Sequence, residues 1–128
     1  MIKGPVQATS LQGTLAHMDT ATPFRAASGA AALLLLLAML GPFQKLAEVL
    51  PVSDIVAHTV AFSVIMTALL LNFRKPGRLS LGCLALLVGL GVEGIQHLTG
   101  RGAQTHDVLA DLVGIAVVLS AWTRRPWF

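Results

Sequence analysis

The most informative stretch of this chain is LSLGCLALLVGLGVEGIQHL, residues 79–98. It carries no charged residue before Glu93, and its length of about 20 residues suits a helix that crosses a bilayer. Small residues let a second helix approach closely, and an ionisable group at membrane depth should face protein or water rather than lipid. At helical spacing, one face of this stretch combines both features in Gly82, Ala85, Gly89, Glu93 and Gln96. The sequence therefore predicts that this helix forms the inner wall of a helix bundle.

Composition places the chain among integral membrane proteins. Its 128 residues are enough for one domain, and 55% of them are hydrophobic while only 12% are charged. Charged residues usually make up about a quarter of a soluble domain. The net charge of +3 is small and forms no basic stripe, so we expect no nucleic-acid partner. The single cysteine, Cys83, excludes an intrachain disulfide.

Four apolar segments predict an all-α membrane protein built as a bundle of four transmembrane helices. The predicted spans cover residues 26–43, 54–73, 79–98 and 107–122. Residues 1–25 are polar and rich in threonine, which predicts an N-terminal tail ahead of a transmembrane domain at residues 26–128. The first span has no polar face and is expected to pack against its neighbours and lipid. Residues 43–50 have the pattern of a short amphipathic segment at the membrane interface.

Basic residues are distributed unequally between the two sides of this predicted bundle. Four spans place the N-terminus, the connection at residues 74–78 and the C-terminus on one side. That side carries seven of the nine basic residues, namely Lys3, Arg25, Arg74, Lys75, Arg78, Arg124 and Arg125. Only Lys45 and Arg101 lie on the other side. Because basic residues concentrate on the cytoplasmic side of membrane proteins, we expect both termini to be cytoplasmic.

Polar residues enter the predicted spans only at the opposite, outer end of the bundle. They come from three separate segments and comprise Asp54, His58, Glu93, Gln96, His97, Arg101, His106, Asp107 and Asp111. Four carboxylates of this set enter the spans, and Arg101 can pair with carboxylates in bidentate fashion. We therefore predict a salt-bridged, water-accessible acidic pocket that opens to the outer face, with Arg101 as its hub.

Three interpretations of this polar cluster compete. The residues can hold three helix ends together without any chemistry, as buried polar networks do. They can recognise a polar group near the outer leaflet, such as the head group of an envelope lipid or precursor. They can also bind metal or catalyse a reaction, with His58, Glu93 and His97 as zinc ligands. No metallopeptidase signature or nucleophile turn is present, so we expect no metal and no cofactor, and we favour a non-enzymatic role.

Four short motifs follow one another over residues 51–122. They are Asp54-x-x-x-His58-x-x-x-Phe62, Glu93-x-x-Gln96, Gly100-Arg101 and Asp107-x-x-x-Asp111-x-x-Gly114. Their order and spacing resemble the VanZ-like family of small bacterial membrane proteins. The pattern of that family is roughly D-K-x-x-H-x-x-x-F, E-x-x-Q, a Gly-Arg in the following loop, and D-x-x-x-N-x-x-G.

Two departures from the family pattern make this chain more acidic. Ile55 stands where the family often has lysine, and Asp111 stands where it usually has asparagine. The resemblance implies a multi-pass protein of the bacterial cytoplasmic membrane that takes part in the cell envelope, with membrane lipids as partners. The expected function is recognition of an envelope lipid or precursor head group. The alternative is an accessory subunit packed against a larger membrane protein complex.

Overall fold

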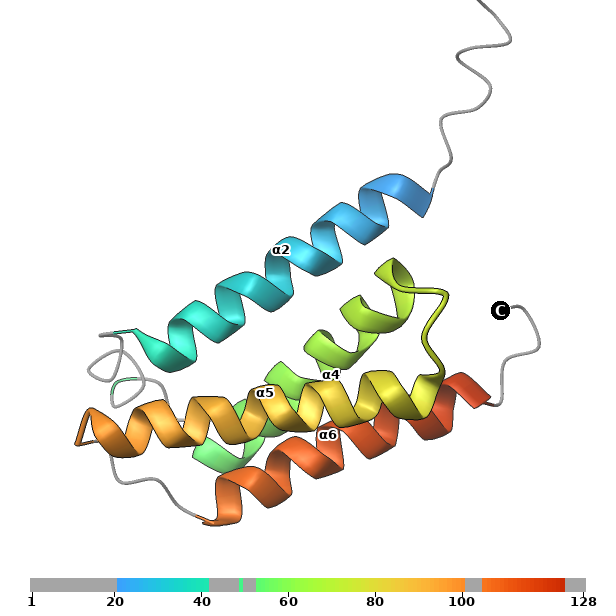
Figure 1. The fold of residues 1–128 in the computed structure, drawn as a ribbon. Coiled ribbons are helices and arrows are strands. Elements are labelled where there is room, and N and C mark those ends of the chain that lie inside the picture. Colours follow the sequence, from blue (N-terminus) through green and yellow to red (C-terminus); the bar gives the residue numbers. More distant parts are fainter. Residues whose placement is uncertain (1–20, 42–48, 50–52, 101–104, 124–128) are drawn as a thin grey trace, which may run out of the picture.

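The described residues form a bundle of four long helices (Figure 1). The computed structural model describes residues 21–41, 49, 53–100 and 105–123. The helices are α2 (Ala21–Leu40), α4 (Asp54–Asn72), α5 (Arg78–Leu98) and α6 (Thr105–Thr123). Each is long and apolar enough to cross a membrane, and the described part of the chain contains no strand. The predicted all-α architecture with four membrane-spanning helices is confirmed.

The helices differ from the predicted spans mainly at the start of the first one. Helix α2 begins at Ala21 rather than at residue 26, so the last residues of the predicted tail belong to it. Pro23 does not prevent this early start, because the first turn of a helix needs no backbone N–H donor from its residues. Helix α2 ends at Leu40, ahead of Gly41-Pro42. The predicted interfacial segment lies outside the described residues except for Val49, which is helical and exposed.

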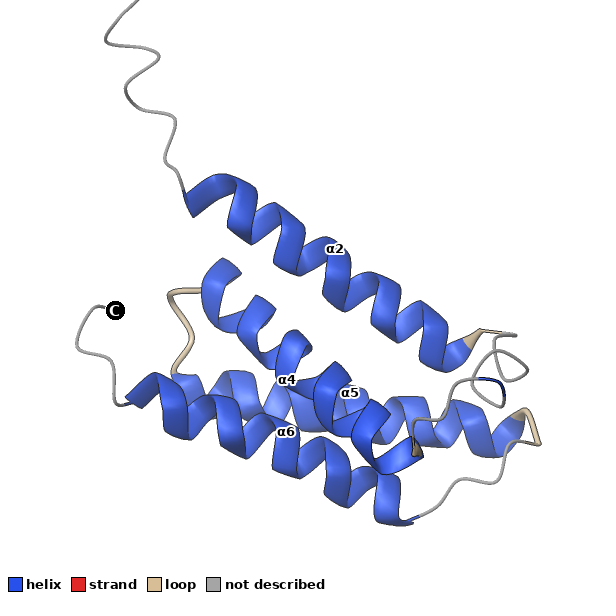
Figure 2. Cartoon of the chain, turned by 180° about the vertical axis from the view of Figure 1, so that it is seen from behind, coloured by secondary structure: helices blue, strands red, loops and turns tan. Residues whose placement is uncertain are grey.

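Successive helices run in opposite directions through the bundle (Figures 1 and 2). Helices α4 and α6 begin at the end where α2 and α5 finish, and we call this the acidic end of the bundle. Helix α4 lies at the centre and packs against all three of the others. Its most extensive contact is with α6, which runs parallel to it, and it carries more of the buried core than any other described helix.

Small and hydroxyl-bearing residues hold α4 and α6 close together. A Cβ atom added at Gly114 would collide with the backbone carbonyl oxygen of Thr59 and would lie 3.1 Å from the backbone nitrogen of Ser63. The Thr59 hydroxyl lies 3.3 Å from the carbonyl oxygen of Ala110, and the Ser63 hydroxyl lies 3.4 Å from that of Gly114. Both hydroxyls also donate to α4's own carbonyls at 2.8 Å. Close backbone approach with shared hydroxyl donors is typical of paired transmembrane helices.

The core of the bundle is built around Phe62, which is completely buried. Two glycines leave room for its side chain, because a Cβ at Gly89 of α5 or at Gly114 of α6 would lie within 3.3 Å of Phe62 atoms. The apolar core extends from this ring away from the acidic end and consists of Ala61, Phe62, Ile65, Met66, Leu70, Leu81, Ala85 and Ile115.

Helix α2 is attached to this core by half-buried side chains and by two amide groups. At the acidic end, Gln96 Nε2 donates to the carbonyl oxygen of Met39 at 3.0 Å. That carbonyl belongs to the last turn of α2, where backbone acceptors have no partner within the helix. At the other end, Asn72 Nδ2 lies 3.3 Å from both the carbonyl oxygen of Arg25 and the hydroxyl of Ser28. The two amides therefore fix the two ends of α2 against α5 and α4.

The Gly114→Ala substitution is expected to destabilise the bundle by about 1–3 kcal/mol, because the added methyl group must push α4 and α6 apart. Gly91→Ala is the matched control, since a Cβ at Gly91 meets nothing within 4 Å. Unfolding in mild detergent, followed by tryptophan fluorescence, measures the difference. Equal stability of the two variants would contradict the close packing at Gly114.

Candidate functional site

Four polar side chains are buried at the acidic end of the bundle. His58 comes from α4, Glu93 from α5, and Asp107 and Asp111 from α6. Their exposed fractions are 7%, 7%, 8% and 0%, respectively. His58, Glu93 and Asp111 lie about 6–9 Å along the helix axis from the nearest helix end, at about 1.5 Å per residue. Side chains from three helices therefore lie at similar depth near the acidic end. The sequence predicted this placement for His58, Glu93, Asp107 and Asp111.

His58 is the centre of this group. Its Nδ1 lies 2.8 Å from Asp111 Oδ1, and its Nε2 lies 3.9 Å from Asp107 Oδ2. The shorter distance is that of a charge-assisted hydrogen bond, in which Nδ1–H donates when Asp111 is ionised. The two aspartates occupy positions i and i+4 of α6, so both face the same imidazole.

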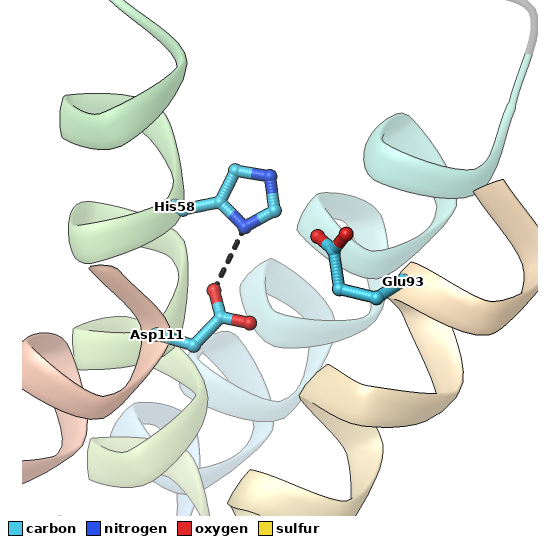
Figure 3. A group of neighbouring side chains, drawn as sticks. All are labelled: His58, Glu93 and Asp111. Carbon is cyan, nitrogen blue, oxygen red and sulfur yellow. Dashed lines mark hydrogen bonds and ion pairs between the residues drawn. The ribbon is translucent and has the colours of Figure 1, made fainter. Parts of the chain in front are cut away.

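Glu93 approaches the same imidazole from α5 (Figure 3). Its carboxylate and that of Asp111 point toward the space beside the His58 ring. Glu93 Oε1 and Asp111 Oδ2 are fully buried, and neither has a hydrogen-bond partner among the described residues. A buried polar atom without a partner costs free energy, so each needs an explanation in a native structure.

Gly89 allows the Asp111 carboxylate to pack closely against α5. A Cβ at this position would lie 2.7 Å from Asp111 Oδ2 and would press on the carboxylate. The glycine stands one helical turn before Glu93 on α5, so both residues lie on the same face of the helix. The glycine therefore lets Asp111 lie close to α5, on the face that also carries Glu93.

The described part of the chain provides no lysine or arginine near this group. Arg25, Arg74, Lys75 and Arg78 all belong to the opposite end, at the start of α2 and around the α4–α5 connection. His58 is thus the one basic side chain that touches the buried carboxylates in these ranges. Arg101, the predicted hub of the cluster, lies outside the described residues.

Other residues assigned to the cluster from the sequence lie elsewhere. Asp54 is exposed in the first turn of α4, and His97 and His106 are exposed as well. Gln96 binds the end of α2 rather than the carboxylates. The zinc ligand set considered from the sequence is therefore not the group that the structure assembles, because Asp111 occupies the place given to His97.

The buried group also differs from the open pocket that the sequence predicted. His58, Glu93, Asp107 and Asp111 are all less than 9% exposed, so they form a closed cluster rather than a water-accessible pocket. Thr59 and Ser63, whose hydroxyls contact carbonyl oxygens of α6, were not predicted from the sequence. The recurrence of Thr59, Ser63 and Thr67 at every fourth residue of an apolar helix is the signal that could have revealed them.

Fold and site together define a multi-pass helical membrane protein with a buried histidine–carboxylate cluster near one end of its bundle. Comparison with known protein families, curated proteins and solved structures finds no match to this chain. The function is therefore argued from the residues of the cluster themselves.

The His58→Ala substitution is expected to lower the free energy of unfolding by about 3–5 kcal/mol, because it leaves the fully buried Asp111 carboxylate without its partner. Replacing both residues, in the variant His58→Leu/Asp111→Leu, should recover much of that loss because no charge of the pair is then left buried. The exposed His97→Ala is the control and should change stability little. Denaturation in mild detergent measures all three, and a double variant less stable than His58→Ala would contradict the pairing.

Proposed function

We propose that this chain is a VanZ-like protein of the bacterial cytoplasmic membrane that recognises a polar head group of an envelope lipid or precursor at the outer face. In this proposal both termini lie in the cytoplasm and the acidic end faces outward. Catalysis is not part of the proposed role.

The observation that carries this proposal is the pair of buried carboxylate oxygens without partners, Glu93 Oε1 and Asp111 Oδ2. A polar network that only joins helices is most stable when every member is satisfied. Ionisable side chains within membrane spans are costly and usually mark a functional site. Two buried carboxylate oxygens without partners therefore favour a site that takes a ligand over a purely structural network.

The depth of the cluster agrees with a head-group ligand. The three residues drawn in Figure 3 lie one to two turns inside the helix ends, which is close to the boundary between the hydrocarbon core and the head groups. A head group reaches this depth without crossing the hydrocarbon core. Its acyl chains would lie along the apolar faces of the helices, which expose many large hydrophobic side chains, among them Leu33, Leu34, Leu87 and Leu109.

The proposed orientation is tested by labelling single cysteines from outside intact spheroplasts. In a Cys83→Ala background, Thr99→Cys should react with an impermeant maleimide, because the exposed Thr99 follows α5 at the acidic end. Gly77→Cys, which lies at the opposite end, should react only after the membrane is permeabilised. The reverse pattern would overturn the orientation and with it the recognition of an outer-leaflet group.

The proposed recognition is tested by the lipids that stay bound to the purified protein. The wild type, in mild detergent with an envelope lipid extract, should retain a head-group-bearing lipid that mass spectrometry detects in about stoichiometric amount. Glu93→Gln and Asp111→Asn should each lower the bound amount about tenfold, since a loss of about 1.4 kcal/mol in binding has that effect. Asp54→Asn, on the exposed first turn of α4, is the control and should retain the lipid.

Two results would contradict recognition of a head group. One is equal retention of the lipid by the wild type and both cluster variants. The other is a stable stoichiometric complex with another membrane protein that excludes lipid from the acidic end. That second result would favour the alternative role as an accessory subunit.

A further inference from the structure

We infer that His58, Glu93 and Asp111 bind one divalent transition-metal ion at the acidic end of the bundle. One ring nitrogen of the histidine and one oxygen of each carboxylate lie within 4.8 Å of one another. Each of the three ligands comes from a different helix, and their side chains point toward one another (Figure 3). An ion at this place would join α4, α5 and α6.

The unsatisfied oxygens point to a ligand and not only to a compact polar group. Glu93 and Asp111 are more than nine-tenths buried, and Glu93 Oε1 and Asp111 Oδ2 lack partners in the described ranges. An ion bound by these oxygens supplies the interaction that the protein groups do not. Asp111 Oδ2 can lie this close to α5, the helix that carries Glu93, because residue 89 is a glycine; a Cβ there would lie 2.7 Å from that oxygen.

The charge of the ion also fits the group. The carboxylates of Glu93 and Asp111 together carry two negative charges when ionised, and His58 is the one basic partner among the described contacts. Two carboxylates buried without compensation are strongly unfavourable in a membrane. A divalent cation with a neutral imidazole makes the set of three ligands neutral, with Asp107 as a further carboxylate beside the imidazole. Metal binding also removes the proton shared between histidine and aspartate.

The donor set selects the kind of metal. One imidazole nitrogen and two carboxylate oxygens suit zinc, manganese or ferrous iron, whereas magnesium and calcium prefer oxygen donors alone. Donors around a tetrahedral zinc ion with bonds of about 2.0–2.2 Å lie about 3.3–3.6 Å apart. His58 Nδ1 and Asp111 Oδ1, which are 2.8 Å apart as hydrogen-bond partners, therefore separate by roughly half an ångström to admit the ion. Asp107 Oδ2, 3.9 Å from His58 Nε2, is then placed to orient the imidazole from its far side.

Three protein ligands leave at least one coordination position open for another group. A head-group phosphate would bind at this open position of the metal ion. The role that we assign to the ion therefore rests on the proposed function. Carboxylates alone repel a phosphate, whereas a bound divalent ion attracts it. The ion thus explains how an acidic cluster can recognise a lipid whose head group carries phosphate.

Metal binding is tested on the full chain purified through a tag without histidine, stripped with a chelator, and titrated with Zn²⁺ or with Co²⁺ as a spectroscopic probe. We expect about one ion per chain, a Co²⁺ absorption band typical of nitrogen and oxygen donors, and a higher Tm with the ion bound. Glu93→Gln and Asp111→Asn keep side-chain size and should weaken binding at least about 100-fold, since loss of an outer-shell partner already costs 10–100-fold.

Two matched controls separate the site from other effects. The double variant His97→Ala/His106→Ala removes exposed histidines near the same end and should still bind one ion. Gly89→Ala should weaken binding by displacing the Asp111 carboxylate, whereas Gly94→Ala, where a Cβ meets nothing within 4 Å, should not. A Tm close to the wild-type value without metal shows that each variant is folded.

The inference is overturned if the folded wild type binds neither ion at micromolar concentrations, or if Glu93→Gln and Asp111→Asn bind as the wild type does. Either result would mean that a proton or Arg101, and not a metal ion, balances the negative charge of Glu93 and Asp111. Lipid retention with and without chelator separates this failure from that of the proposed function. Retention that persists in chelator supports head-group recognition while overturning the metal's role, whereas metal binding without lipid retention supports the site alone.

Discussion

The contact between α4 and α6 at Gly114 is the constraint on which the rest of the structure depends. Without a side chain at this position, α6 approaches the α4 backbone beside Thr59 and Ser63. Asp111 lies one turn before Gly114, and His58 lies immediately before Thr59, so the same approach brings the aspartate within 2.8 Å of the imidazole. Apolar packing around Phe62 and the polar group at the acidic end are therefore two results of one helix contact.

Much of the architecture was predictable because length and hydropathy alone decide whether a helix can span a membrane. Helical periodicity also placed His58, Glu93, Asp107 and Asp111 on inward faces, as the structure has them. Periodicity could not place Asp54, His97 or His106, since these residues stand near helix ends where nothing requires burial. The hydrogen-bond partner of Gln96 could not be predicted from the sequence either, because it is a backbone carbonyl of another helix.

Burying His58 and three carboxylates costs free energy, and the neighbouring residues show how the fold accommodates them. Gly89 has no side chain that would collide with the Asp111 carboxylate, and the buried Phe62 ring packs against the same glycine. A leucine or methionine at each polar position would be a simpler way to stabilise the bundle. The cluster is therefore not the arrangement that stability alone would favour, and its two unsatisfied oxygens are the reason why we propose a ligand.

Helix α6 carries both aspartates of the cluster and has the lowest mean hydropathy of the four helices, 1.4. Ionisable side chains within a membrane span raise the cost of inserting it. Helix α4 precedes α6 in the chain, so His58 is synthesised before the aspartates that face it. Pairing with His58 offsets part of the cost of burying these aspartates, so insertion of α6 is coupled to its assembly with α4, which begins 51 residues earlier.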